Sequence, residues 1–126
     1  DKKVWIIDGD GALLMHMGAM ALLGTSNPDN IVHVVINNGA HETVGGQPTV
    51  MSKVDLVMVA KGCGYQHVVS VDSLEDLDRE LQLAKQRNGL SMIEVKCAIG
   101  AREDLGRPTT TAQQNKLAFM AELRKE

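Results

Sequence analysis

Short apolar runs and helical segments alternate along the chain. Four runs rich in β-branched and other apolar residues are predicted to be strands: residues 3–7, 31–36, 67–71 and 91–99. The first two runs are apolar on both faces and have a helical segment between them, which indicates buried parallel strands joined by a right-handed crossover. The sequence therefore predicts a three-layer α/β/α fold with a mainly parallel sheet.

Three segments in the first half of the chain lie between or after the first two strands. Residues 12–23 are predicted to form a helix with apolar side chains around nearly its whole circumference, so we expect later segments or a partner surface to bury it on all sides. Residues 39–49 carry three glycines and one proline and are predicted to be a mobile loop without regular structure. Residues 51–62 are then expected to return to helix.

Capping residues mark two helices in the second half of the chain. Ser73 begins a helix whose first turn is acidic and whose end is basic, and residues 88–89, an Asn-Gly pair, provide its stop. Residues 100–110 are predicted to be a loop. Thr111 and Gln114 form a capping pair for a last helix.

Length and charge exclude several classes of function. The 126 residues correspond to one domain, which we expect to cover residues 1–126. Thirteen Lys and Arg against sixteen Asp and Glu give a net charge of −3, so the chain has no basic field for nucleic acid or for an anionic membrane. The apolar stretch 12–24 is interrupted by His16 and is shorter than the roughly 20 residues of a membrane span.

Cysteine usage predicts a reducing environment. Cys63 and Cys97 form no CxxC pair, which favours two reduced thiols in a cytoplasmic protein. Cys63 and His67 resemble half of a zinc site, but the sequence offers no second pair of ligands to complete the four that a structural zinc site needs.

Polar residues follow the first two predicted strands. Asp10 comes at the end of the first strand and Asn38 at the end of the second, and the carboxyl ends of parallel strands meet at one edge of a sheet. A carboxylate, an amide oxygen and the nearby carbonyl of Ala40 are oxygen ligands that suit Mg²⁺ with phosphate oxygens. The N–H groups of the helix after Gly11 would face an anion. Alternatively, these Asp-Gly and Asn-Gly pairs are turn residues and nothing more.

The spacing of these residues resembles the signature of thiamine diphosphate-dependent enzymes. Residues 9–11 read GDG, and 25 residues separate them from the paired asparagines 37–38. The resemblance implies that Mg²⁺ is held by Asp10, Asn38 and the carbonyl of Ala40. It also implies that the cofactor-binding residues are Gly9, Asp10, Gly11, Ala12, Asn38 and Ala40. Many members of the family have a phosphate-binding serine where this chain has Ala12.

A closer resemblance, to the carboxy-terminal domain of phosphonopyruvate decarboxylases, rests on the stretches GDGALLMHMG, NNGAHETVGGQPT and GAREDLGRPTTT. It implies decarboxylation of the 2-oxo acid 3-phosphonopyruvate to phosphonoacetaldehyde and CO₂, and sulfopyruvate decarboxylases are close relatives of this family. It also implies a homo-oligomer and a pyrimidine-binding domain on the same or another chain. We therefore expect residues 1–126 to be a fragment that supplies the diphosphate- and Mg²⁺-binding half.

Candidates for contact with substrate are fewer. His41 follows the predicted metal loop and is the candidate catalytic residue for proton transfer, because imidazole titrates near neutral pH. Arg102 and Arg107 would suit a phosphonate clamp, although solvated surface arginines are the simpler interpretation. Gly45 and Gly46 would either expose backbone N–H groups to an anion or permit loop movement.

Other interpretations remain open. A strand, a glycine loop and a helix also fit a dinucleotide dehydrogenase, but Leu14 stands at the third glycine position of that motif. Asp10 beside a pyrophosphate would need a cation, which favours the Mg²⁺ site. A non-catalytic interaction module of the same fold is a further alternative. His16 and His33 lie inside apolar runs and are predicted to be core histidines.

Overall fold

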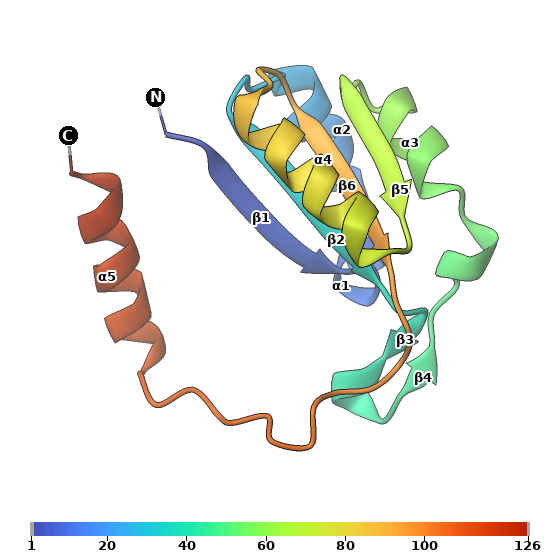
Figure 1. Ribbon diagram of the computed structural model, residues 1–126, viewed down its shortest axis with the longest axis vertical. Coiled ribbons are helices and arrows are strands. Elements are labelled where there is room, and N and C mark those ends of the chain that lie inside the picture. The colour runs from blue at the N-terminus through green and yellow to red at the C-terminus, as the bar shows by residue number, and fades with distance from the viewer. Residues whose placement is uncertain (1, 126) are drawn as a thin grey trace.

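Helices and strands alternate along the chain as the hydrophobic pattern predicts (Figure 1). The computed structural model describes residues 2–125. Its elements are β1 (Val4–Gly9), α1 (Asp10–Met15), α2 (Gly18–Ser26), β2 (Ile31–Asn37), β3 (Ala40–His41), β4 (Gln47–Pro48), α3 (Leu56–Gly62), β5 (His67–Val71), α4 (Leu74–Gln86), β6 (Ser91–Lys96) and α5 (Ala112–Leu123). Two 3₁₀ turns, η1 (Glu42–Val44) and η2 (Met51–Lys53), precede β4 and α3.

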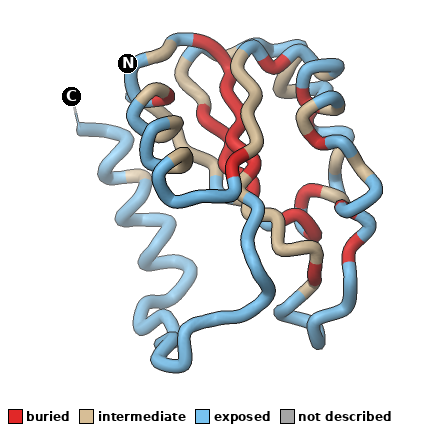
Figure 2. Tube along the Cα trace, turned by 45° about the vertical axis from the view of Figure 1, so that its right-hand side comes forward, coloured by how far each residue is buried: buried red, intermediate tan, exposed pale blue. Residues whose placement is uncertain are grey.

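The sheet confirms the predicted parallel architecture. Its four strands run in the order β1-β2-β6-β5, and every pairing is parallel. The two central strands are buried on both faces (Figure 2), which explains the nearly unbroken apolar sequence of β2; β6 also buries the polar residues Ser91 and Glu94. In the register of β1 with β2, Gly9 lies opposite Ile36, so both strands deliver their following loops to the same edge.

Helices cover both faces of the sheet and make the three predicted layers. On one face the buried contacts of α1, α2 and α3 are Leu13, Met20 and Leu56. On the other face α4 contributes Ala84 and the half-buried Leu77. The acidic start of α4 follows Ser73. The Ser73 side chain accepts a hydrogen bond from the backbone N–H of Asp76, which caps the helix.

The single helix predicted at 12–23 is wrong, because the chain breaks at residues 16–17 into α1 and α2. Within this chain α3 and the sheet cover one face of these helices, and burial of the other face by a partner surface stays a prediction. Met15 is 82% exposed and Leu22 is 70% exposed. His16 is exposed as well, so its assignment to the core is wrong.

Two further expectations need correction between β2 and β5. Residues 39–49 are not free of regular structure, because β3 pairs antiparallel with β4 and left-handed Gly45 and Gly46, at φ +97° and +72°, turn the chain between them. The helix expected at 51–62 begins at Leu56, because the Asp55 side chain caps it by accepting from Met58 N.

His33 is a core histidine, as predicted. It is 5% exposed, its Nδ1 lies 3.1 Å from the Tyr65 hydroxyl, and its Nε2 lies 3.5 Å from Asp8 Oδ2. Burial lowers the pKa of His33, and the neighbouring Asp8 only partly opposes this. Both cysteines, Cys63 and Cys97, are free thiols.

The last helix, α5, lies apart from the sheet, beyond β1 (Figure 1). Thr111 and Gln114 form the predicted capping box. All side chains of α5 are exposed except that of Met120, which is half-buried, and Lys2 Nζ donates to the carbonyl of Glu122 near its end at 2.7 Å. Over residues 2–125, the helices are all too short or too polar to cross a bilayer.

Candidate functional site

A pocket of about 290 Å³ lies at the carboxyl ends of β1 and β2, beside α1 and β3. Its lining residues are Gly9, Asp10, Gly11, Ala12, Ile36, Asn38, Ala40, His41, Glu42 and Thr43. The structure thus brings together every residue that the sequence predicts for the metal, the diphosphate and proton transfer. The parallel register of β1 and β2 causes this convergence.

Asp10 begins α1 and is almost completely buried. Its side chain is 2% exposed, and the Thr49 hydroxyl donates a hydrogen bond of 2.5 Å to Asp10 Oδ2. Thr49 is itself 8% exposed and is held by its backbone N–H, which donates to Gly39 O at 2.8 Å. Sequence reasoning missed Thr49, because its contact with Asp10 depends on how the β3–β4 hairpin folds back over α1.

Asn38 turns the chain between β2 and β3. Its Oδ1 accepts from Ala40 N at 3.0 Å, an Asx-type turn, and its Nδ2 donates to Glu42 Oε2 at 2.5 Å. Ala40 is 6% exposed. Glu42 was also missed, since a single glutamate in a glycine-rich segment carries no sequence signal that separates it from a solvated one.

His41 places its imidazole against the backbone of Gly11. A Cβ added to Gly11 would lie 2.3 Å from His41 Nδ1 and 2.5 Å from Cε1. Glycine is therefore required at position 11 as long as the His41 ring stays in the pocket.

The substitution Gly11→Ala tests this contact without any ligand. In the wild-type background we expect a loss of stability of about 1 kcal/mol or more, because the new methyl group displaces the ring. In the His41→Ala background the same change should be neutral or stabilising, because alanine favours helix over glycine by up to about 1 kcal/mol. Urea unfolding of the four proteins measures the difference; equal effects of Gly11→Ala in both backgrounds would contradict the contact.

The donor set of the pocket fits a hard cation such as Mg²⁺ and does not fit a zinc site built from cysteine and histidine. Within residues 2–125, His, Cys, Asp and Glu side chains form no group of three or more that could hold a metal. Asp10, Asn38 and the Ala40 carbonyl instead offer one carboxylate and two neutral oxygens, which are hard ligands. The buried Asp10 carboxylate forms no ion pair with any residue from 2 to 125. Because a buried charge is costly without a partner, a cation at this position would stabilise it.

Cys97 follows β6 and is close enough to the pocket to be influenced by its charge. Partial burial raises the pKa of its thiol, and the negative charges of Asp10 and Glu42 raise it further. A raised pKa leaves less of the Cys97 thiol in the nucleophilic thiolate form.

The arginines and glycines that the sequence suggested for contact with substrate do not line this pocket. Arg102 is exposed and pairs with Asp104 at 3.2 Å, and neither Arg102 nor Arg107 lines the pocket. Gly45 and Gly46 also lie outside its lining, in the turn between β3 and β4. In this structure the arginines are solvated surface residues.

Comparison with known proteins identifies the family. Residues 1–95 match the family described as "Thiamine pyrophosphate enzyme, C-terminal TPP binding domain". The chain belongs to this family.

Relatives within this thiamine pyrophosphate enzyme family are named decarboxylases. The chain is 39% identical to phosphonopyruvate decarboxylase of Streptomyces viridochromogenes over 95% of its own length and 30% of the relative's. It is 40% identical to phosphonopyruvate decarboxylase of Streptomyces hygroscopicus over 85% of its length and 27% of the relative's. It is 36% identical to sulfopyruvate decarboxylase subunit beta of Methanocaldococcus jannaschii over 76% of its length and 51% of the relative's. The predicted resemblance to phosphonopyruvate decarboxylases is confirmed, and the chain spans less than a third of those relatives.

Solved structures support the fold. A putative thiamin diphosphate-dependent enzyme from Mycobacterium smegmatis matches with a TM-score of 0.64 and 26% identity, over 79% of this chain and 19% of that one. Transketolase from Campylobacter jejuni matches with a TM-score of 0.61 and 24% identity, over 76% of this chain and 15% of that one. These matches agree with the parallel, helix-covered sheet of the TPP-binding domain.

Proposed function

We propose that this chain forms the diphosphate- and Mg²⁺-binding half of a thiamine diphosphate-dependent decarboxylase that acts on 3-phosphonopyruvate. The observation that carries the proposal is the buried Asp10 carboxylate, which has no cationic partner among residues 2–125 and lines a pocket with Asn38 and Ala40. Sequence similarity to phosphonopyruvate decarboxylases supports the choice of substrate.

The residues of this chain hold the charged end of the cofactor. Asp10 Oδ1, Asn38 Oδ1 and the Ala40 carbonyl would bind Mg²⁺, with diphosphate oxygens filling further positions. The N–H groups of Gly11 and Ala12, in the first turn of α1, have no partner within that helix and are available to the diphosphate. Thiamine diphosphate, when bound, supplies an electron sink for the electrons released as the 2-oxo acid loses CO₂.

The remaining parts of the proposal concern what completes the site. A pyrimidine-binding domain, on the same polypeptide or on another, would hold the other end of the cofactor, and the assembly would be a homo-oligomer in the cytoplasm. Sulfopyruvate is the second candidate substrate, because a sulfopyruvate decarboxylase subunit is 36% identical to this chain.

A substrate assay tests the reaction. The complete protein should release CO₂ from 3-phosphonopyruvate, form phosphonoacetaldehyde, and require both thiamine diphosphate and Mg²⁺. A higher kcat/KM for sulfopyruvate would transfer the assignment to the second substrate. Absence of turnover with either acid, together with intact cofactor binding, would favour a non-catalytic module.

The role of His41 is tested by separating turnover from cofactor affinity. Because its imidazole lines the pocket and carries nitrogens that can donate or accept a proton, we expect His41→Ala to lower kcat by about 100-fold while the Kd of the cofactor stays the same. Steady-state kinetics and cofactor titration of both proteins measure the two effects. A weaker Kd with unchanged kcat would instead assign His41 to binding of the diphosphate, as its position beside Gly11 also allows.

A further inference from the structure

Glu42 uses both oxygens of its carboxylate to join two segments that are distant in sequence. Its Oε2 accepts from Asn38 Nδ2 at 2.5 Å, and its Oε1 accepts from Gly100 N at 2.8 Å. The second bond spans 58 positions and connects η1 to the segment that follows β6. Both contacts need an acceptor, and an ionised carboxylate has acceptors only.

The first contact determines how the Asn38 amide is oriented. If the amide were turned over, its oxygen would face the acceptor Glu42 Oε2, and its NH₂ group would face the donor Ala40 N. Both contacts would then be repulsive. The observed orientation instead directs Oδ1 toward Ala40 N at 3.0 Å. Glu42 therefore sets which end of Asn38 is presented beside Ala40, where the metal ligands are proposed.

The neighbouring asparagine is held in the same way. Asn37 Nδ2 donates to Glu94 Oε1 at 2.7 Å, and the Asn37 carbonyl accepts from Cys97 N at 3.0 Å. Each member of the asparagine pair thus donates to its own glutamate. The Glu94 pair belongs to the sheet, because Glu94 is 4% exposed, whereas the exposed Glu42 lies in the wall of the pocket.

We propose that Glu42 is a positioning residue for the Mg²⁺ site. It holds the Asn38 amide with its oxygen available to the metal, and through Gly100 it anchors the loop that carries Asn38 and Ala40 to the segment after β6. This inference rests on the proposed function. Glu42 acts through Asn38, because its two oxygens accept from Asn38 Nδ2 and from Gly100 N and so fix the loop that carries the proposed metal ligands.

The first test needs no cofactor. Amide hydrogen exchange of Gly100 should become about tenfold faster or more in Glu42→Ala, because a hydrogen bond of ordinary strength is lost. Glu103→Ala, which removes an exposed carboxylate from the same segment, is the matched control and should leave Gly100 unchanged. Equal exchange in Glu42→Ala and wild type would overturn the anchoring role.

The second test measures the Mg²⁺ concentration that gives half-maximal binding of thiamine diphosphate. Loss of a group that orients a metal ligand typically costs about 10 to 100-fold in metal affinity, so Glu42→Gln should raise this concentration at least about tenfold. Full cofactor binding should return at high Mg²⁺. The ratio of the half-maximal Mg²⁺ concentrations of Glu42→Gln and wild type should stay the same when the salt is raised to about 0.5 M, where simple charge effects are screened.

Each other outcome contradicts a distinct statement. A ratio that falls to one at high salt would reduce Glu42 to a general charge effect, and binding that no Mg²⁺ concentration restores would make it a metal ligand. Either result overturns the positioning role. Wild-type protein that binds no cofactor in the presence of Mg²⁺ would contradict the proposed function and, with it, the role of Glu42.

Discussion

Asp10→Asn is expected to abolish Mg²⁺-dependent binding of thiamine diphosphate while leaving the fold intact. The change removes the one charged ligand of the proposed metal site, and the loss of affinity should exceed about 100-fold, since even groups that only orient ligands contribute 10 to 100-fold. The asparagine still offers an oxygen to the Thr49 hydroxyl, which donates to Asp10 Oδ2 in the wild type.

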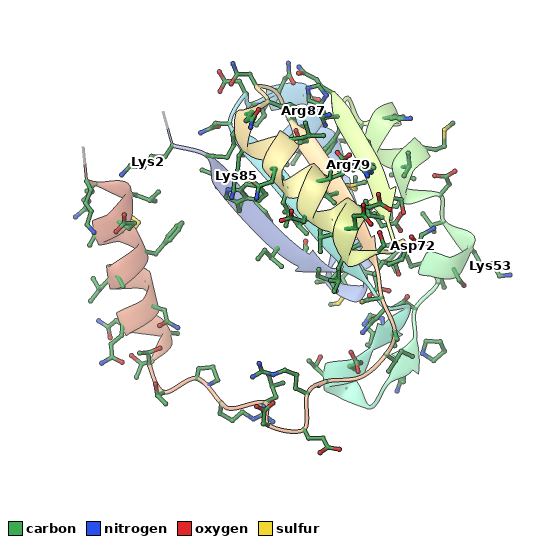
Figure 3. All side chains as sticks on the ribbon, viewed as in Figure 1. Lys2, Lys53, Asp72, Arg79, Lys85 and Arg87 are labelled. Carbon is green, nitrogen blue, oxygen red and sulfur yellow. The ribbon has the colours of Figure 1, made fainter. Side chains whose placement is uncertain are left out.

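The same substitution should leave the unliganded protein as stable as the wild type or more stable. A 2%-exposed carboxylate that has no cation beside it destabilises the unliganded protein, because burying a charge is costly, and function commonly keeps such destabilising groups in place. Calorimetric titration and urea unfolding measure the two effects. Asp72→Asn is the matched control, because Asp72 is exposed, lies between β5 and α4 (Figure 3) and does not line the pocket. Cofactor affinity in Asp10→Asn equal to that of this control would contradict the metal assignment.

Gly24→Ala is expected to give the largest loss of stability. A Cβ at Gly24 would lie 1.6 Å from the carbonyl oxygen of Cys63 and 2.7 Å from its carbonyl carbon. Both atoms belong to the backbone after α3, so no side-chain rotation can relieve the clash. The two helices must separate, and we expect a cost of about 3 kcal/mol or more, a large part of the roughly 5–15 kcal/mol that stabilises an ordinary domain.

Gly18→Ala provides the control on the same helix. A Cβ at Gly18 has no heavy atom within 4 Å, so this variant should keep or increase stability through the higher helix propensity of alanine, by up to about 1 kcal/mol. Urea unfolding of both variants decides the matter. Similar midpoints for Gly24→Ala and Gly18→Ala would show that α2 and the end of α3 are not in backbone contact.

The pattern of apolar residues was sufficient to predict the sheet and the place of the site. Parallel strands with buried faces can be recognised from local sequence, because most side chains on both faces are apolar. The ends of β1 and β2 then meet at one edge whatever the loops do, which is why Asp10, Asn38 and His41 could be placed together before the structure was known.

Contacts that depend on tertiary structure were not predictable in this way. Thr49 and Glu42 are polar residues in a glycine-rich segment, and their partners become neighbours only when the β3–β4 hairpin folds against α1 and the segment after β6 returns to it. The segment 12–23 was expected to be buried all round by later segments or by a partner surface. Within this chain α3 and the sheet leave Met15 and Leu22 exposed, so burial of that face by a partner stays a prediction.

Calorimetric titration of the protein with thiamine diphosphate, with and without Mg²⁺, tests the central claim most directly. A parallel titration with a nicotinamide dinucleotide tests the competing interpretation of the glycine loop. We predict saturable binding of thiamine diphosphate that requires Mg²⁺, and no binding of the dinucleotide. Binding of thiamine diphosphate that is equally strong without Mg²⁺, or binding of the dinucleotide alone, would contradict the assignment of Asp10, Asn38 and Ala40 as a metal site for the diphosphate.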